Sequence, residues 1–266
     1  MNGRNIPDAL IGSSGFVGST LLRQRAFDYE FRSTNIEEIN RKTFDLVVCA
    51  AAPAQKWIAN REPGADRQKI DGLISHLEAV RCRKFVLVST VDVFGSPVLV
   101  NEDTPVEENG LHAYGLHRRL LEKFVEDRFP DSLVVRLPGL VGPGLRKNVI
   151  FDLLNKHNLH AIESRSAFQF YPMINLWYDI RIALEARLKL VHLTAEPIRV
   201  SELSEACFGK RFEQTLPNSP VAYDMQTKFA RLFGGDSPYQ YSKRETILAV
   251  RAYAQSESLT YRAEGA

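Results

Sequence analysis

Long hydrophobic runs are missing from this chain of 266 residues, and no window approaches the roughly 18 apolar residues of a membrane span. The N-terminus lacks the apolar core of a signal peptide. Cysteine is scarce: Cys49, Cys82 and Cys207 lie far apart and form no CxxC pair or Cys/His cluster. This pattern indicates reduced thiols inside a cell and argues against a metal site. We therefore expect a cytoplasmic protein with no metal ligands.

A strong charge of either sign is also missing. The formal net charge is +2, and the basic residues occur in short runs, "RCRK" at 81–84 and "HRR" at 117–119. No tract is dense enough to indicate capture of nucleic acid, and we interpret both runs as solvated helix ends. With 44% hydrophobic residues, the chain is long enough for one large domain or for a domain with a smaller lobe.

Apolar runs of strand length alternate with amphipathic segments of helix length. The strand runs are "ALIG", "FDLVVCAAA", "KFVLVST", "SLVVRLPG" and "LKLVHLT", and the helix segments cover 16–24, 64–81, 114–128 and 175–187. Such alternation is typical of parallel strands that are buried on both faces and joined by crossover helices. The sequence therefore predicts an α/β fold with a doubly wound parallel sheet.

A smaller lobe is predicted after "RLPGLVGPG", where glycine and proline end a strand and release a loop. The stretch "SAFQFYPMINLW", a helix and "KLVHLT" then predict a return to the sheet. We accordingly expect a main domain over 1–140 with a return segment at about 168–196. The smaller lobe would be formed by 141–167 and 197–266.

The first chemical motif is "LIGSSGFVGSTLL", in which Gly12, Gly15 and Gly18 follow the first strand and open a helix. Glycines at this spacing allow a tight turn, close approach to a pyrophosphate and close packing of helix on sheet. The helix N-terminus would offer unpaired N–H groups to the phosphates. The alternative is a purely structural turn; the strand–turn–helix context favours a dinucleotide site, which makes 1–140 the dinucleotide-binding domain.

The preference between NAD and NADP is set about 20 residues further on, where an acidic residue favours NAD and an arginine accommodates the 2′-phosphate of NADP. Counting from Gly12 leads to Arg32, followed by Ser33 and Thr34, with no carboxylate among them. We predict NADP over NAD, the alternative for Arg32 being a surface arginine on an edge segment.

Five stretches, "GSSGFVG", "FDLVVCAAAP", "VLVSTVDVFG", "AYGLHRRLLE" and "RLPGLVGPG", resemble in order and spacing the extended short-chain dehydrogenases/reductases. This group includes nucleotide-sugar epimerases, dehydratases and 4-keto reductases. The resemblance covers about residues 7–150, and more weakly extends to 195. It implies a Rossmann fold, an NAD(P) cofactor, a sugar or nucleotide-sugar substrate, and a homodimer paired through helices 64–81 and 114–128. The cofactor residues it implies are Gly12, Ser14, Gly15, Phe16, Val17, Gly18, Arg32, Ser33, Ala50, Ala51, Ala52, Tyr114, Arg118 and Pro138.

The same resemblance implies three catalytic residues. Thr90 stands where the family has its catalytic Ser or Thr, Tyr114 stands at the acid/base, and Arg118 occupies the place of the family's lysine. A phenol has a pKa of about 10, so a tyrosine base needs a nearby cation, and lowering that pKa by roughly three units takes about 4 kcal/mol. We expect Arg118 to lower the pKa of Tyr114 and to bind the ribose. Arginine is always charged but is bulkier than lysine.

The alternative for this group is a surface pair of an aromatic ring and a cation, with Thr90 capping a turn. His117 lies three residues from Tyr114, and we expect it to be exposed. The remaining histidines considered, His112, His157 and His160, show no pattern of a metal site or a triad and are expected at the surface.

The substrate side departs from the family pattern. Gly139 stands where the family often has asparagine, Val141 where it often has an aromatic residue, and Phe168 where it has a phosphate-binding arginine. The run Arg146–Asn148 could replace that cation or simply form a solvated helix start. Lys56 and Trp57 follow "VVCAAAP", near where family members often contact substrate, and the indole could stack on a sugar.

These observations together predict an NADP-linked oxidoreductase that reduces a 4-keto sugar or nucleotide sugar. Epimerisation is the second interpretation. A third is a sensor or regulatory protein that keeps the nucleotide pocket and lacks turnover, because Arg118 replaces the family's lysine.

Overall fold

The computed structural model describes residues 6–236 and 238–257, which form two compact units. The first unit comprises the chain up to Gly95 together with Thr104–Leu137 and Leu176–His192. The second comprises Ser96–Asp103, Pro138–Asn175 and the chain from Leu193 onward. Relative to the expected boundaries, the segment 96–103 joins the second unit, and the return to the first unit begins at Leu176 and not at 168.

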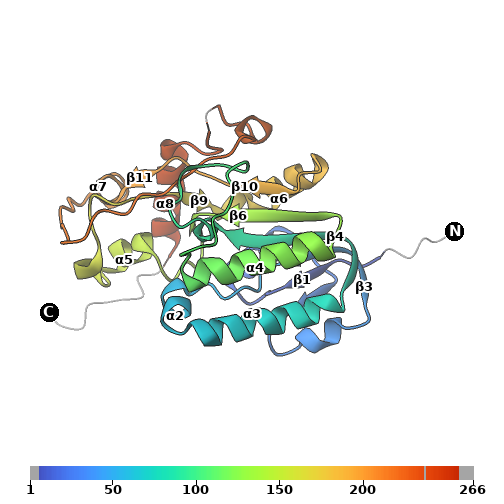
Figure 1. The fold of residues 1–266 in the computed structure, drawn as a ribbon. Coiled ribbons are helices and arrows are strands. Elements are labelled where there is room, and N and C mark those ends of the chain that lie inside the picture. The colour runs from blue at the N-terminus through green and yellow to red at the C-terminus, as the bar shows by residue number, and fades with distance from the viewer. Residues whose placement is uncertain (1–5, 237, 258–266) are drawn as a thin grey trace. The chain divides into compact units, whose positions relative to one another are not determined.

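The first unit contains a six-stranded sheet, shown in Figure 1. Its strands in chain order are β1 (Ala9–Ile11), β2 (Tyr29–Phe31), β3 (Thr43–Cys49), β4 (Arg81–Thr90), β6 (Ser132–Leu137) and β10 (Leu190–His192). They lie in the order β10-β6-β4-β3-β1-β2, and every pair is parallel. A doubly wound Rossmann-type α/β fold is therefore confirmed.

Helices cover both faces of this sheet. They are α1 (Phe16–Gln24), α2 (Lys56–Arg61), α3 (Pro63–Glu78), α4 (Ala113–Arg128) and α6 (Leu176–Glu185). Helices α3 and α4 lie side by side on one face (Figure 1), while α1 contacts α6. Alternate strand residues such as Ile11, Val47 and Leu87 pack with Ile70 and Leu121 of these helices in one buried cluster. The sheet is hydrophobic on both faces, as crossover connections require.

The second unit is built from short pairs of strands and from helices. Its strands are β5 (Val98–Val100), β7 (Gly139–Val141), β8 (Ala167–Phe168), β9 (Phe170–Pro172), β11 (Ile198–Arg199) and β12 (Asp224–Met225). They pair as β7 with β9, β8 with β11 and β5 with β12. The helices are α5 (Val149–Asn155), α7 (Val200–Phe208) and α8 (Lys243–Ser256), the last of which begins with a capping box of Ser242 and Glu245.

The two basic runs are not solvated helix ends, contrary to expectation. The predicted helix over 64–81 ends at Glu78, and "RCRK" begins β4, where Arg81 and Cys82 pair with Thr43 and Phe44 of β3. The run "HRR" at 117–119 lies in the first half of α4. Tertiary pairing with β3 thus decides the structure of 81–84, because local charge alone does not distinguish a helix end from a strand start.

The cysteines are unpaired, and Cys49 is fully buried in β3. No helix within residues 6–236 and 238–257 has the length and hydropathy needed to cross a membrane.

Candidate functional site

The candidate site lies at the carboxyl ends of the strands in the first unit. The chain leaves β1 toward β2 on one side and returns to β3 on the other, so the loops after β1 and β3 diverge. In open parallel sheets, ligands bind at such a switch point. The backbone N–H of Gly12 donates to the carbonyl of Phe31 at 2.7 Å, and that of Ala50 donates to Ile11 at 2.8 Å. These bonds hold the first glycine beside the ends of both neighbouring strands.

Two glycines of this loop occupy places that no other residue would fit. Gly12 has φ of +89°, and an added Cβ would lie 2.6 Å from the carbonyl oxygen of Ala50. A Cβ on Gly18 would lie 2.1 Å from the carbonyl oxygen of Gly12, so α1 packs directly on the turn. At Gly15 the nearest atom would be at 3.4 Å, which leaves this position open. The loop therefore has the shape that a dinucleotide cradle needs.

The start of α1 can accept an anion. Gly15 is its N-cap residue, and no side chain caps the helix. The first turn contains no acidic residue that would compete with a bound anion. Ser14 is exposed, and Phe16 and Val17 are partly exposed at the first turn. The free N–H groups of a helix N-terminus and its dipole favour a phosphate. Together with the open position at Gly15, these residues fit the pyrophosphate of a dinucleotide.

Arg32 and Ser33 follow β2 directly and are both exposed. A turn holds them in place: the side chain of Asn35 accepts from the N–H of Arg32 at 2.8 Å and donates to the carbonyl of Glu30 at 3.1 Å. Because Phe31 accepts hydrogen bonds from the glycine loop, Arg32 stands next to that loop. The position suits an arginine that meets a 2′-phosphate.

Thr90 and Tyr114 meet at the end of β4. Thr90 is the last residue of that strand, and its hydroxyl accepts from the N–H of Asp92 at 3.2 Å. Tyr114 lies in the first turn of α4 and is 9% exposed, and a hydrogen bond with Thr90 favours its phenolate form. The start of α4 is held close: a Cβ on Gly115 would lie 2.0 Å from the carbonyl oxygen of Asp92.

Arg118 lies over Tyr114, with its guanidinium carbon 4.0 Å from the centre of the ring. Its side chain is buried, and four of its five N–H groups donate to protein oxygens. Nη1 donates to Asp66 Oδ2 at 2.5 Å and to the carbonyl of Tyr114 at 3.2 Å. Nη2 donates to Asp66 Oδ1 at 2.9 Å and to the carbonyl of Pro53 at 2.5 Å. Nε is buried without a partner among the described residues, so it is the one donor left for a ligand.

Asp66, on α3, is a member of this group that sequence reasoning missed. It is 5% exposed and also bonds His117, whose Nδ1 lies 2.7 Å from Asp66 Oδ2. The expectation that His117 is exposed is wrong, since it is 7% exposed and faces α3. Although burial raises the pKa of Asp66, hydrogen bonds from Arg118 and His117 hold it below its usual value. Asp66 is therefore an anion that faces the Arg118 cation.

Burial raises the pKa of Tyr114, and the charge of Arg118 and the hydrogen bond with Thr90 oppose that rise without reversing it. Arg118 therefore lowers this pKa, as expected, but does not by itself bring it below the ordinary value of a phenol. The guanidinium acts in the expected direction, but desolvation of the phenol outweighs it. The phenol of Tyr114 is therefore protonated at neutral pH.

An ion pair and a histidine also lie near the phenol. Lys56 Nζ, at the start of α2, lies 2.6 Å from Asp92 Oδ1 in the 3₁₀ turn Val91–Val93. His112 is half-buried and is the N-cap of α4, where its Nδ1 accepts from the N–H of Gly115 at 3.0 Å. Burial, and then the Lys56 charge, lower the pKa of His112. His112 was expected at the surface; it is instead half-buried and fixes the first turn that carries Tyr114.

The other histidines and Trp57 are less constrained. His160 is exposed, and His157 is half-buried with its Nδ1 2.8 Å from Asp152 Oδ1. Trp57 is 61% exposed, and the guanidinium of Arg61 lies 4.8 Å from its ring. Its indole is therefore free to meet a partner or ligand on one face.

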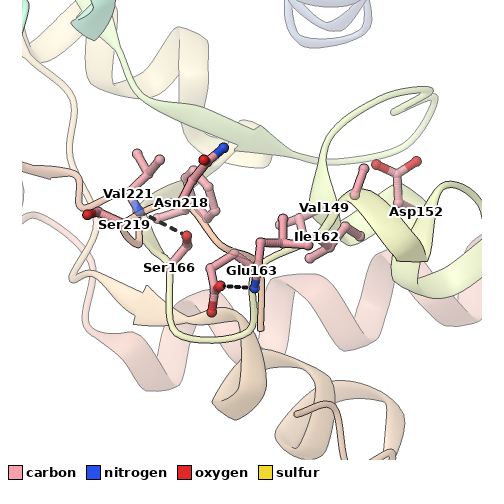
Figure 2. A pocket seen from close by; sticks show the side chains of 11 residues that line it. Val149, Asp152, Ile162, Glu163, Ser166, Asn218, Ser219 and Val221 are labelled. Carbon is pink, nitrogen blue, oxygen red and sulfur yellow. Dashed lines mark hydrogen bonds between the residues drawn. The ribbon is translucent and has the colours of Figure 1, made fainter. Parts of the chain in front are cut away.

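The second unit contains a pocket of about 250 Å³ (Figure 2). Six of its lining side chains are apolar, among them Phe168, and five are polar: Asp152, Glu163, Ser166, Asn218 and Ser219. No lysine, arginine or histidine is among the described residues that line it. Glu163 is held by Arg165 through Nε at 2.8 Å and by the N–H of Leu216 at 2.5 Å, and the Arg165 hydrogen bond lowers its pKa to about 2.

The remaining substrate-side predictions fall in the second unit as well. Asn148 caps α5: its Oδ1 accepts from the N–H of Ile150 at 3.0 Å. This is the helix-start alternative given above. Arg146 and Lys147 are exposed and do not line the pocket. Pro138 is buried and begins this unit.

Comparison with known proteins supports this fold. No protein-family model matches the chain, and a search of curated protein sequences finds no match. Among solved structures, the chain is similar to the Bordetella bronchiseptica enzyme WbmG in complex with NAD (TM-score 0.74, 15% identity, 97% of each chain covered). It is also similar to dTDP-4-dehydrorhamnose reductase from Bacillus anthracis in complex with NADP (TM-score 0.71, 14% identity, covering 97% of this chain and 100% of that one). A third similar structure is UDP-glucose 4-epimerase from Thermotoga maritima with UDP-glucose (TM-score 0.70, 14% identity, covering 93% of this chain and 97% of that one).

Proposed function

We propose that the chain is a nicotinamide-dinucleotide-dependent oxidoreductase that reduces a carbonyl group of a sugar or nucleotide sugar. The observation that carries this proposal is the meeting of Thr90 and Tyr114 at the end of β4, on the same sheet edge as the glycine loop of Gly12. Similar structures have been solved with NAD and with NADP, and they include a 4-keto-sugar reductase and an epimerase.

The proposed chemistry divides the work between the cofactor and the protein. A bound reduced dinucleotide would supply the hydride that the carbonyl carbon receives. Thr90 would hold the carbonyl oxygen by a hydrogen bond, and Tyr114 would donate its phenolic proton to that oxygen as the negative charge develops. Solvent then returns a proton to the phenolate. Replacing Tyr114 by Phe should lower kcat by about 10²- to 10⁴-fold and leave dinucleotide affinity nearly unchanged. Steady-state assays would measure kcat, and fluorescence titration would measure the affinity. Unchanged turnover would refute the assignment.

The dinucleotide would be held by the glycine loop, the start of α1, Ala50–Ala52 and the turn after β2. Arg32 favours NADP, because no carboxylate stands beside it to bind a ribose diol. Arg118 would contact the ribose only through Nε, the donor that the protein does not use. We expect NADPH to bind at least tenfold more tightly than NADH, and Arg32→Glu to abolish that ratio while leaving NADH affinity within a few-fold. Equal affinity of the natural chain for NADPH and NADH would contradict the predicted preference for NADP.

The pocket of the second unit is proposed to bind an uncharged, sugar-like group. A diphosphate in a protein usually meets arginine or lysine, whereas this pocket offers carboxylates, hydroxyls and an amide. We therefore expect it to bind a group without a phosphate. NADPH oxidation should be followed with a panel of 4-keto nucleotide sugars and keto sugars without phosphate. Phe168→Arg should improve use of the diphosphate-bearing compounds if they are poor substrates of the natural chain.

A sensor that binds the dinucleotide without turnover is the alternative, and one observation favours it: four of the Arg118 donors are already used. The buried hydrogen bond between Thr90 and Tyr114 at the end of β4 argues against it, because a sensor has no need of a proton donor there. Tight dinucleotide binding with no substrate-dependent oxidation across the panel would establish the sensor.

The cellular location and the assembly are also part of the proposal. The chain is proposed to be cytoplasmic and to form a homodimer through α3 and α4, as the resemblance implies. Light scattering at micromolar concentration would give twice the mass of 30.1 kDa for such a dimer.

A further inference from the structure

Asp66, Arg118 and Tyr114 form one layered group in which Arg118 lies between the carboxylate and the phenol ring. The carboxylate of Asp66 takes two guanidinium N–H groups of Arg118, at 2.5 and 2.9 Å, and the guanidinium in turn covers the Tyr114 ring at 4.0 Å. Asp66 is 5% and Arg118 is 2% exposed, so water does not screen the pair. The carboxylate therefore offsets part of the guanidinium charge, and burial of the phenol outweighs what remains of it at Tyr114.

The groups around the phenol do not replace the offset charge of Arg118. From α2 and the 3₁₀ turn, Lys56 is paired with Asp92, so that pair too is neutral overall. From α3 comes Asp66. From α4 come His112, which is used as a helix cap, and His117, which bonds Asp66. The phenol therefore sits among balanced charges and a desolvating environment.

We propose that Asp66 is a positioning residue that fixes Arg118 against the Tyr114 ring and offsets its charge, so that the phenol stays a proton donor suited to carbonyl reduction. This rests on the proposed function for its direction of reaction. A phenol that remains protonated is ready to give its proton to an oxygen that has received a hydride from a reduced nicotinamide dinucleotide. Oxidation of an alcohol, which is also the first half of an epimerisation at that carbon, needs the phenolate instead. The group thus favours the reductase interpretation.

The ionisation of Tyr114 can be measured without any cofactor or substrate. The chain has nine tyrosines, so the absorbance of tyrosinate is recorded against pH for each protein and for the same protein carrying Tyr114→Phe. The difference isolates one phenol. In the natural chain, Tyr114 should remain protonated up to at least about pH 10, the value of a free phenol. Ionisation of Tyr114 below that pH in the natural chain would overturn the proposal, whatever the variants do.

Asp66→Asn keeps the shape and leaves the cation uncompensated. The pKa of Tyr114 should then fall below about 10, at least one unit under its value in the natural chain, which is tenfold more phenolate at a given pH. Mere loosening of the site would bring the phenol to the free value of about 10 and no lower, so a fall to that value alone would also contradict the proposal. Asp66→Glu restores the charge and should restore the high value.

Two further variants complete the design. The double variant Asp66→Asn with Arg118→Gln has no unpaired buried charge, and its phenol should titrate like that of the natural chain; ionisation below pH 10 would count against the offset by Asp66. Asp45→Asn is the matched control, because Asp45 also binds an arginine, Arg83, through both oxygens, at 2.5 and 2.7 Å, but at the exposed start of the sheet. It should leave the Tyr114 titration unchanged.

The pH profile of catalysis gives a second readout. In the natural chain, kcat/KM for carbonyl reduction should stay level to about pH 10, and in Asp66→Asn it should begin to fall at least one unit earlier. Absence of NADPH oxidation together with absence of dinucleotide binding would refute the proposed function and leave the titration result standing. A normal reductase whose Asp66→Asn variant keeps the natural phenol titration would refute only the role of Asp66.

Discussion

Helix α4 carries two buried clusters of arginine and carboxylate that are alike in chemistry and different in use. In its first turns, Arg118 pairs with Asp66 of α3 and covers Tyr114. Further along, Glu122 receives Arg136 of β6 at 3.0 and 2.7 Å and the Ser89 hydroxyl of β4 at 2.6 Å. The first cluster touches a phenol, whereas no tyrosine is among the hydrogen-bond partners that the described residues give the second. Two buried ion pairs of the same residue types can therefore differ in role, because the role depends on the groups that each pair contacts.

The second cluster ties the helix to the sheet. Glu122 is fully buried and Arg136 is 2% exposed, and Arg119 is a third partner of the carboxylate, at 3.0 Å. Because Ser89 and Arg136 sit one residue before the ends of β4 and β6, this cluster fixes α4 against the strand ends at which Thr90 lies. It thereby sets the distance between the two catalytic candidates without touching either one.

The largest expected effect separates the clusters by stability. Glu122→Ala leaves Arg136 as an unpaired buried cation and should lower the free energy of unfolding by about 3–5 kcal/mol. Denaturant unfolding followed by circular dichroism measures this. Glu126→Ala is the matched control, because Glu126 also bonds Arg119, at 3.2 Å, but is 41% exposed. It should cost less than about 1 kcal/mol. Equal losses for both variants would show that burial does not decide the role of the Glu122 cluster.

Asp66→Asn should cost somewhat less, about 3 kcal/mol at neutral pH, since Arg118 keeps the carbonyls of Pro53 and Tyr114 as acceptors. The loss should depend on pH. The pKa of Asp66 is lower in the folded chain than in the unfolded chain, so its contribution is complete above about pH 4 and is lost as the pH falls through the folded value. The difference from the natural chain should therefore shrink below about pH 4. Asp71→Asn, in the exposed pair with Arg67 on the same helix, should show neither the loss nor the pH dependence.

Much of the first cluster's surroundings could be predicted from the sequence, because the signals there are local. Gly12, Gly15 and Gly18 act within one turn, and their spacing alone indicates the strand–turn–helix that the structure contains. Thr90 and Tyr114 were implied by the resemblance of short stretches in the right order, and the structure brings these two residues together. These features depend on backbone shape and on neighbours a few residues away.

The clusters themselves could not be predicted, because their partners come from distant parts of the chain. Asp66 lies 52 residues from Arg118 and 51 from His117, and a lone aspartate in a helix is ordinarily solvated. His117 was expected at the surface for the same reason. One signal was present: Gly115, beside Tyr114, is costly in a helix unless something approaches closely, and here the carbonyl of Asp92 does.

Ser89→Ala tests how much of the second cluster depends on its hydroxyl. The loss of one hydrogen bond to a buried carboxylate should cost about 2 kcal/mol, less than removing the carboxylate itself. The Tyr114 titration should not move, since Arg118 and Asp66 are untouched. A shifted titration would mean that the two clusters are coupled through α4, and the distinction between them would then fail.

The smallest expected effect concerns His117, the outer member of the first cluster. His117→Gln removes one of the partners of Asp66 while Arg118 keeps both of its bonds to that carboxylate, so the free energy of unfolding should fall by only about 1 kcal/mol. His157→Gln is the control, because His157 makes a similar bond to Asp152 with its side chain 36% exposed. It should cost less. The phenol of Tyr114 should titrate as in the natural chain in both variants, because the Arg118 charge remains offset by Asp66. If His117→Gln instead lowered the pKa of Tyr114 as far as Asp66→Asn does, the histidine would be needed to hold the carboxylate in place. His117 would then position Asp66, which in turn positions Arg118 against the phenol.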